Sequence, residues 1–357
     1  MTPNPALGVL FHWMGGLASA SFYVPYRFVK RWSWETYWLA GGIFSWIIAP
    51  WLIALFWTRD LLSVLRATSP HDLFWPFFFG LLWGVGGLTF GLTMRYLGLS
   101  LGMAIVLGLC AAFGTLMPPL FAGEFASKVL GTRSGRIILL GVAVCLLGIA
   151  IAGMAGIAKE RATTLAERRA VIAEFNLKKG IGVAILSGVM SACFAYGLAA
   201  GDPIRGLTLA RGTRPLWQGL PVLVVVLIGG FTTNFVWSVF LNIRNRSTHE
   251  YFAERSGNDA PVPLFHNYLF CALAGCTWYM QFFFYTMGET QMGIYKFSSW
   301  TLHMASIIIF SSLWGLALKE WRGAGSLALR LLFGALLLLV LSTMIVGYGN
   351  YLGAGAA

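Results

Sequence analysis

The sequence predicts an all-α integral membrane protein with about ten transmembrane helices. Of its 357 residues, 58% are hydrophobic and only 11% are charged, whereas soluble domains are about 25% charged. The apolar residues are grouped in runs of about 20, the length a helix needs to cross about 30 Å of hydrocarbon. Charged residues fall mainly between these runs, so membrane-spanning helices explain the pattern.

Ten apolar runs define the predicted helices, and their bounds come from hydropathy and flanking polar residues. Five lie in the first half of the chain, at 6–24, 37–57, 73–96, 101–122 and 137–157. Five lie in the second half, at 180–201, 217–241, 264–288, 297–318 and 328–349. The first run is read as a membrane helix and not as a signal peptide, because no basic residue precedes Arg27.

A polar linker at 159–179 separates two halves, 1–158 and 180–357, each with five helices. Because five is odd, the second half must enter the membrane from the opposite side, which predicts two inverted five-helix repeats. A weak internal match at an offset of 172 supports this: Gly8, Gly16, Ser19, Ala20 and Phe22 correspond to Gly180, Gly188, Ser191, Ala192 and Phe194.

The distribution of basic residues predicts the orientation. Sixteen of the 25 Lys and Arg residues fall in the odd-numbered loops, so the positive-inside rule places those loops in the cytoplasm and both termini in the periplasm. The net charge of +12 belongs to these short clusters. Since no extended basic stripe exists, nucleic-acid binding is not expected.

Several function classes lack their signatures in this sequence. We find no phosphate-binding loop, zinc-type spacing or nucleophile elbow. The five cysteines lie inside apolar runs, where thiols behave as small hydrophobes. We therefore expect no enzyme, metal site or cofactor, and no ATP-driven pump. A secondary transporter remains; a membrane sensor without transport is the rival, although the chain has no sizeable soluble domain to serve as its output.

Ionisable groups inside membrane spans are costly and are therefore candidates for function. His12 shares a narrow polar helix face with Gly16, Ser19 and Tyr23. His303 lies inside the ninth predicted span. Each histidine either faces a transport cavity, where it can exchange a proton at physiological pH, or bonds a neighbouring backbone carbonyl.

The eighth predicted helix carries Trp278, Gln281, Tyr285 and Glu289 on one face. An aromatic ring can cover the apolar face of a sugar, and an amide or carboxylate can bond its hydroxyls. The alternative is an interfacial tryptophan with a solvated Glu289 at the helix end. Asn234, in the seventh helix, is a second candidate for substrate binding.

Glu35 lies in a tryptophan-rich stretch just before the second predicted helix. It is either a first-turn acid favoured by the helix dipole or a carboxylate that exchanges a proton at a cavity. With His12, Glu289 and His303, it completes our set of proton-coupling candidates.

Glycines four residues apart predict close helix contacts. Such pairs occur at Gly80 and Gly84, Gly87 and Gly91, and Gly98 and Gly102.

Several collinear stretches resemble the bacterial L-rhamnose–proton symporter family, within the drug/metabolite transporter superfamily. These stretches are WSWET at 32–36, GLTMRYLG at 91–98, GTLM at 114–117, EFNLKKG at 174–180, YMQFFFY at 279–285, SWTLHM at 299–304 and LKEW at 318–321. They extend along nearly the whole chain. His12, Glu35, Gln281 and His303 match positions associated with the family.

The resemblance implies ten helices in two inverted halves. It also implies import of L-rhamnose, and of related sugars, with a proton across the inner membrane. One departure concerns Lys296, near which family members carry an acid, so substrate range or stoichiometry could differ here. Export or exchange of another small metabolite is the alternative function. The sequence leaves the oligomeric state open.

Overall fold

The computed structural model describes residues 3–97, 99–162, 176–254 and 261–354. All its regular elements in these ranges are helical. The first half contains α1 Pro5–Ser21, α2 Tyr23–Tyr26, α3 Trp34–Gly42, the π-helix η1 Ile43–Ile48, α4 Ala49–Trp57, α5 Leu61–Ala67, α6 Pro70–Leu97, α7 Leu99–Phe121, the π-helix η2 Phe125–Leu130 and α8 Arg133–Ala162.

The second half contains α10 Leu177–Ala200, α11 Asp202–Ala210, the 3-10 helix η3 Pro215–Trp217, α12 Leu220–Asn245, the 3-10 helix η4 Thr248–Tyr251, α13 Leu264–Thr290, the 3-10 helix η5 Gly293–Ser298, α14 Ser299–Ala317 and α15 Gly325–Ala354. Most of the predicted linker, 163–175, lies outside the described residues.

The prediction of an all-helical membrane fold is confirmed. Within the described chain, 9 stretches are long and apolar enough to cross a membrane. The remaining predicted span is α13, which has 27 residues. Its many aromatic and polar residues lower its hydropathy, so it is recognised by its length and by its place between α12 and α14.

The second predicted span is not one regular helix. It consists of α3, the π turn η1 and α4, and Pro50 follows the π turn. Proline has no N–H and its ring clashes with the carbonyl four residues earlier. A π turn is a common local solution, and such turns often occur at functional sites.

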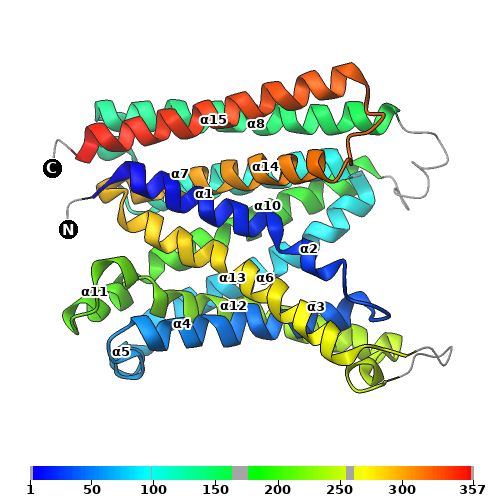
Figure 1. Ribbon diagram of the computed structural model, residues 1–357. Coiled ribbons are helices and arrows are strands. Elements are labelled where there is room, and N and C mark those ends of the chain that lie inside the picture. The colour runs from blue at the N-terminus through cyan, green and yellow to red at the C-terminus, as the bar shows by residue number, and fades with distance from the viewer. Residues whose placement is uncertain (1–2, 98, 163–175, 255–260, 355–357) are drawn as a thin grey trace.

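The helices pack in a recurrent pattern. Helix α1 packs on α13 and α14, and α10 packs on α6 and α7. Helix α6 also packs on α12, and α3 also packs on α13. Helices α8 and α15 form a long pair that covers one side of the molecule, and both termini lie at the same end (Figure 1).

The predicted glycine contacts are confirmed in part. A side chain at Gly80 or Gly84 would collide with α12, on Val226 or on Thr233 and Gly230. At Gly87 and Gly91 nothing lies within 4 Å, so that part of the prediction is wrong. Glycine spacing alone does not reveal which helix face meets a neighbour.

Candidate transport site

Two histidines and a tyrosine from three helices meet in the interior of the molecule. The His12 ring of α1 lies 5.2 Å from the Tyr285 ring of α13, and the Tyr285 ring lies 5.3 Å from the His303 ring of α14. The histidines are only 0% and 1% exposed. We call these three residues the imidazole cluster.

None of the four imidazole nitrogens of His12 and His303 has a hydrogen-bond partner among the described residues. Buried polar atoms in proteins almost always have partners, so such atoms require an explanation. Leaving a buried donor or acceptor unpaired costs about 1–3 kcal/mol. The sequence left two alternatives for each histidine, a ring that faces a transport cavity or a ring bonded to a backbone carbonyl. The carbonyl bond is not observed for either His12 or His303.

Small residues allow the three helices to approach. A Cβ built at Gly15 of α1 would lie 2.8 Å from the carbonyl oxygen of Gln281 and 3.4 Å from Nδ1 of His303. Glycine at this position therefore lets α1 contact both α13 and α14. Gln281 itself is 5% exposed, one turn before Tyr285 on α13.

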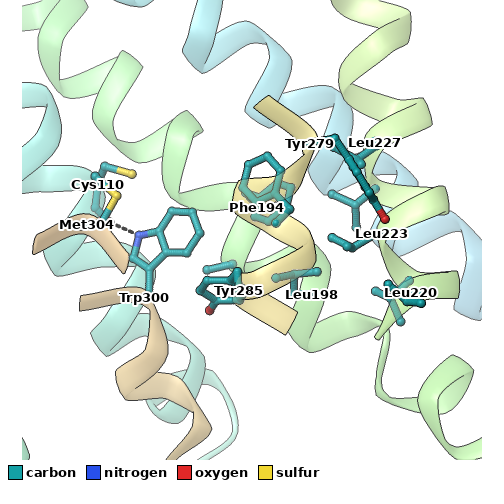
Figure 2. Close-up of a cluster of buried hydrophobic side chains, with 14 of the residues drawn as sticks. Cys110, Phe194, Leu198, Leu220, Leu223, Leu227, Tyr279, Tyr285, Trp300 and Met304 are labelled. Carbon is teal, nitrogen blue, oxygen red and sulfur yellow. Dashed lines mark hydrogen bonds between the residues drawn. The ribbon is translucent and has the colours of Figure 1, made fainter. Parts of the chain in front are cut away.

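Aromatic side chains surround the imidazole cluster. The ring of His303 lies 6.2 Å from Phe282 and 6.1 Å from Trp300, and Phe194 stacks on Phe282 at 4.0 Å. Figure 2 shows Phe194, Tyr285 and Trp300 converging from different helices, with the Trp300 indole donating to the Cys110 carbonyl at 3.0 Å. The centre thus combines unpaired imidazoles with broad apolar faces.

A tryptophan cluster, formed by Trp38, Trp46 and Trp278, gathers the other aromatic candidates. Trp46 lies 5.9 Å from Trp38 and 5.4 Å from Trp278. Tyr23 is about half exposed and stacks with Trp38 at 6.4 Å. The Trp38 indole donates to the side-chain oxygen of Asn234 at 3.2 Å, and the Asn234 amide donates to the Gly230 carbonyl.

Phe282 links the two clusters, because its ring lies 5.0 Å from Trp278 and 6.2 Å from His303. Tyr23 lies outside the helix that carries His12, since α1 ends at Ser21 and Tyr23 begins α2. The predicted stripe from His12 to Tyr23 is therefore divided between the two clusters.

A charged cavity of about 260 Å³ lies beside the C-terminal end of α13. Its lining includes Asp202 and Arg205 of α11, Glu289 of α13 and Lys296 of η5. Arg205 donates to Glu289 at 2.5 Å and to Asp202 at 2.8 Å, and Lys296 donates to Asp202 at 2.6 Å. Glu289 is thus neither free nor simply solvated, since its side chain is only 11% exposed.

Glu35 lies at the opposite end of the helices from α11, inside a polar network. Its Oε1 accepts from Asn245 at 2.9 Å and from Ser247 at 2.8 Å. Nearby, Glu250 accepts from the backbone and hydroxyl of Ser33. Burial raises the pKa of Tyr251, in the same network, to about 12. The network ties the start of α3 to the end of α12.

The sequence did not single out Asp202 or Arg205. Both fall between two apolar runs, where Arg205 contributes only to the count of basic loop residues. The detectable signal is the short segment that follows Gly201, whose polar and apolar residues alternate at helical spacing. No spacing rule could pair them with Glu289, because the partner lies 84 residues further along the chain.

In helical membrane proteins, buried ionisable groups shared between several helices mark paths for substrates, ions or protons, so the fold and the site indicate a membrane transport protein. Comparison with known proteins defines the class further. The chain belongs to the L-rhamnose-proton symport protein family, whose model matches residues 1–352. A protein of Cronobacter sakazakii named L-rhamnose-proton symporter is 39% identical over 346 residues, covering 96% of this chain and 97% of its own. Proteins of the same name from Yersinia pestis and Yersinia pseudotuberculosis are 38% identical with the same coverage.

Proposed function

We propose that this protein imports L-rhamnose together with a proton across the bacterial inner membrane. The main support is the full-length similarity to L-rhamnose-proton symporters, which extends over 96% of the chain. The imidazole cluster adds physical support, because buried nitrogens without partners can bond the hydroxyls of a sugar and the rings beside them can cover its apolar face.

The sugar route follows one face of α13. Trp278, Gln281, Tyr285 and Glu289 follow one another on this helix, and the face connects the tryptophan cluster, the imidazole cluster and the charged cavity. In this proposal His12, Gln281 and Tyr285 bind sugar at the centre. Tyr23, Asn234 and Trp278 bind it on the side of the tryptophan cluster.

Four groups are proposed to exchange the proton: His12, Glu35, Glu289 and His303. His12 and His303 contact the central sugar site, whereas Glu35 and Glu289 lie toward opposite ends of the helices. A symporter needs sugar and proton jointly to favour the state that crosses the membrane. One charge moving through 100 mV supplies about 2.3 kcal/mol, which sustains a sugar gradient of roughly fiftyfold.

The two halves are proposed to be inverted repeats, and the helix starts support this. Asn4 caps α1 by accepting from Leu7, and Asn176 caps α10 by accepting from Lys179. These asparagines have the same offset of 172 as the five matched pairs. The Asn4 backbone donates to Gln291 just after α13, and the Asn176 backbone donates to Tyr96 near the end of α6.

Equivalent glycines also make equivalent contacts. A side chain at Gly8 would collide with the end of α13, and one at Gly180 would collide with the end of α6. A side chain at Gly16 would collide with α14, and one at Gly188 would collide with α7. The contacts of α1 with α13 and α14 in one half thus correspond to the contacts of α10 with α6 and α7 in the other. A twofold axis in the membrane plane, which exchanges the two halves, requires this correspondence.

Sugar-driven proton uptake tests the proposed function. Cells that express the protein are suspended without buffer, and L-rhamnose is added while the external pH is recorded. We expect a transient external alkalinisation that a protonophore abolishes and that cells with an empty vector lack. Sugar uptake without any alkalinisation would contradict proton symport.

Export or exchange of another metabolite is the rival function. Counterflow in proteoliposomes separates it from sugar import, because preloaded unlabelled substrate accelerates uptake of its labelled form. We expect acceleration with L-rhamnose. Acceleration only with other solutes in a panel would favour the rival.

A further inference from the structure

The charged cavity holds a group that the sequence did not connect with transport. We propose that Arg205 on α11 is the counter-ion of Glu289, and that this buried pair is where the transported proton binds. Arg205 acts through Glu289 and is therefore a positioning residue. The inference rests on the proposed function and assigns its proton to one site.

The geometry distinguishes this pair from the surface ion pairs. The Arg205 side chain is 8% exposed and the Glu289 side chain 11%, and they are 2.5 Å apart. Their side chains nevertheless line a cavity of about 260 Å³ with Gln218, Thr286 and Lys296. The carboxylate is thus enclosed by protein but lies beside a polar space that water and hydrogen ions can fill.

The charged groups around Glu289 come from two elements that line the cavity, α11 and η5. Helix α11 supplies Asp202 and Arg205, η5 supplies Lys296, and one turn earlier on α13 lies the Tyr285 phenol. The four charged groups are two acids and two bases, so their charges cancel when Glu289 is ionised. Proton binding leaves one net positive charge and frees one guanidinium N–H from its carboxylate.

This arrangement couples proton binding at Glu289 to the contact between α13 and α11. When Glu289 takes a proton, its attraction to Arg205 is lost, and Arg205 remains paired with Asp202 through its other nitrogen. Helix α13 is then released from α11. Breaking a buried ion pair by removing one charge is costly, so the released state is favoured only when other contacts compensate.

The same helix carries the sugar-binding residues. Tyr285, one turn from Glu289, contacts both His12 and His303. Helix α1 also touches α13 next to Glu289, because a Cβ at Gly288 would lie 2.8 Å from Nε2 of His12. A sugar held by the imidazole cluster and a proton held by Glu289 therefore act on one rigid element.

The variant Glu289→Gln tests the assignment, since glutamine resembles a carboxyl group that is permanently protonated. In proteoliposomes we expect L-rhamnose exchange to persist within about threefold of the original rate and to lose its dependence on pH. Accumulation against a gradient and sugar-driven alkalinisation should be abolished. Accumulation at the original level, or exchange with the original pH dependence, would overturn the proposal.

The variant Arg205→Lys tests the positioning role. Lysine keeps the charge but not the paired geometry of the guanidinium, so the ionised carboxylate is less favoured. Exchange should then persist to higher pH, by about one pH unit. An unshifted pH profile would show that Arg205 has only a structural role.

Glu124→Gln is the matched control, because Glu124 pairs with Lys128 at 2.6 Å but the two side chains are 44% and 38% exposed. It should leave accumulation and pH dependence unchanged. If Glu289→Gln unfolds, the double variant Glu289→Gln with Arg205→Gln removes the unpaired charge and is measured in the same way. Loss of exchange in both variants despite normal thermal unfolding would also overturn the proposal.

Failure of the inference and of the proposed function are distinguishable. If the original protein shows no sugar-driven proton uptake, the symport proposal fails before any variant is made. If the original protein is coupled and Glu289→Gln is equally coupled, only the site assignment fails.

Discussion

His12 and His303 occupy buried positions where a leucine would make the folded protein more stable. Both are almost fully buried, and their ring nitrogens have no partner among the described residues. A buried unpaired polar group destabilises the fold by about 1–3 kcal/mol. Functional sites often carry such costs, and stabilising substitutions there reduce activity.

Replacing His303 by leucine should therefore separate stability from transport. We expect His303→Leu to raise the free energy of unfolding by about 1 kcal/mol, because an unpaired polar ring gives way to an apolar side chain. L-rhamnose binding should fall at least tenfold. Thermal unfolding in detergent and sugar-dependent tryptophan fluorescence measure the two effects.

Ser306, one turn further along α14, provides the comparison. Its hydroxyl lies within hydrogen-bonding distance of the His12 and His303 carbonyls, at 2.9 Å and 2.7 Å. Ser306→Ala should lower stability by about 1 kcal/mol, because it removes a satisfied hydrogen bond. If His303→Leu were as destabilising as Ser306→Ala, the imidazole would have a structural role that its missing partners do not reveal.

At the residue scale, the sequence can point to candidate side chains only where the physical reason is local. An ionisable residue inside an apolar run is costly in a membrane and therefore stands out in the sequence. His12 and His303 are candidates for this reason. Helical spacing placed Tyr285 and Glu289 on one face of α13. Arg205 could not be found in this way, because its importance comes from a partner on another helix.

At the level of helices, close approaches depend on which face a glycine presents. Gly80 lies against α12, where a Cβ would collide with the backbone of Val226. Gly87, seven residues later on α6, has nothing within 4 Å. Both glycines have the same sequence signature, so the two positions form a natural pair for comparison.

Gly80→Ala should lower the unfolding temperature and transport, because α6 and α12 must separate to admit the methyl group. Gly87→Ala should be neutral or stabilising by up to about 1 kcal/mol, since alanine favours helix more than glycine does. Thermal unfolding and exchange rates of both variants are the measurement. Equal effects at the two positions would contradict the observed packing of α6.

The π turn between α3 and α4 is another feature of single helices that the sequence shows only in part. Pro50 was visible in the sequence, but the π turn that precedes it depends on how the chain relieves the missing hydrogen bond. Trp46 lies in this turn and contacts Trp38 and Trp278. The irregular turn therefore places one member of the tryptophan cluster.

For the whole molecule, the orientation in the membrane is predicted from the charges of the loops and the number of spans. Both termini lie at the same end of the helices (Figure 1), as an even number of spans requires. The odd-numbered loops, which hold 16 of the 25 basic residues, are predicted to be cytoplasmic.

Reporter fusions test this orientation. Alkaline phosphatase, which is active only outside the cytoplasm, should be active when fused after Tyr351 and inactive when fused after Arg322. The physical reason is that basic loops resist translocation. The opposite pattern at both sites would invert the topology while leaving the fold unchanged.

The sequence by itself determined the membrane class and the approximate bounds of the long helices, because a segment that crosses lipid must be apolar and must satisfy its own backbone hydrogen bonds. It also identified the family through strings of residues along the chain. The tertiary structure decided which of the few polar side chains meet. Three helices bring His12, Tyr285 and His303 together, and α11 brings Arg205 to Glu289. These contacts depend on packing between segments far apart in the chain, which no local pattern of hydropathy or spacing contains.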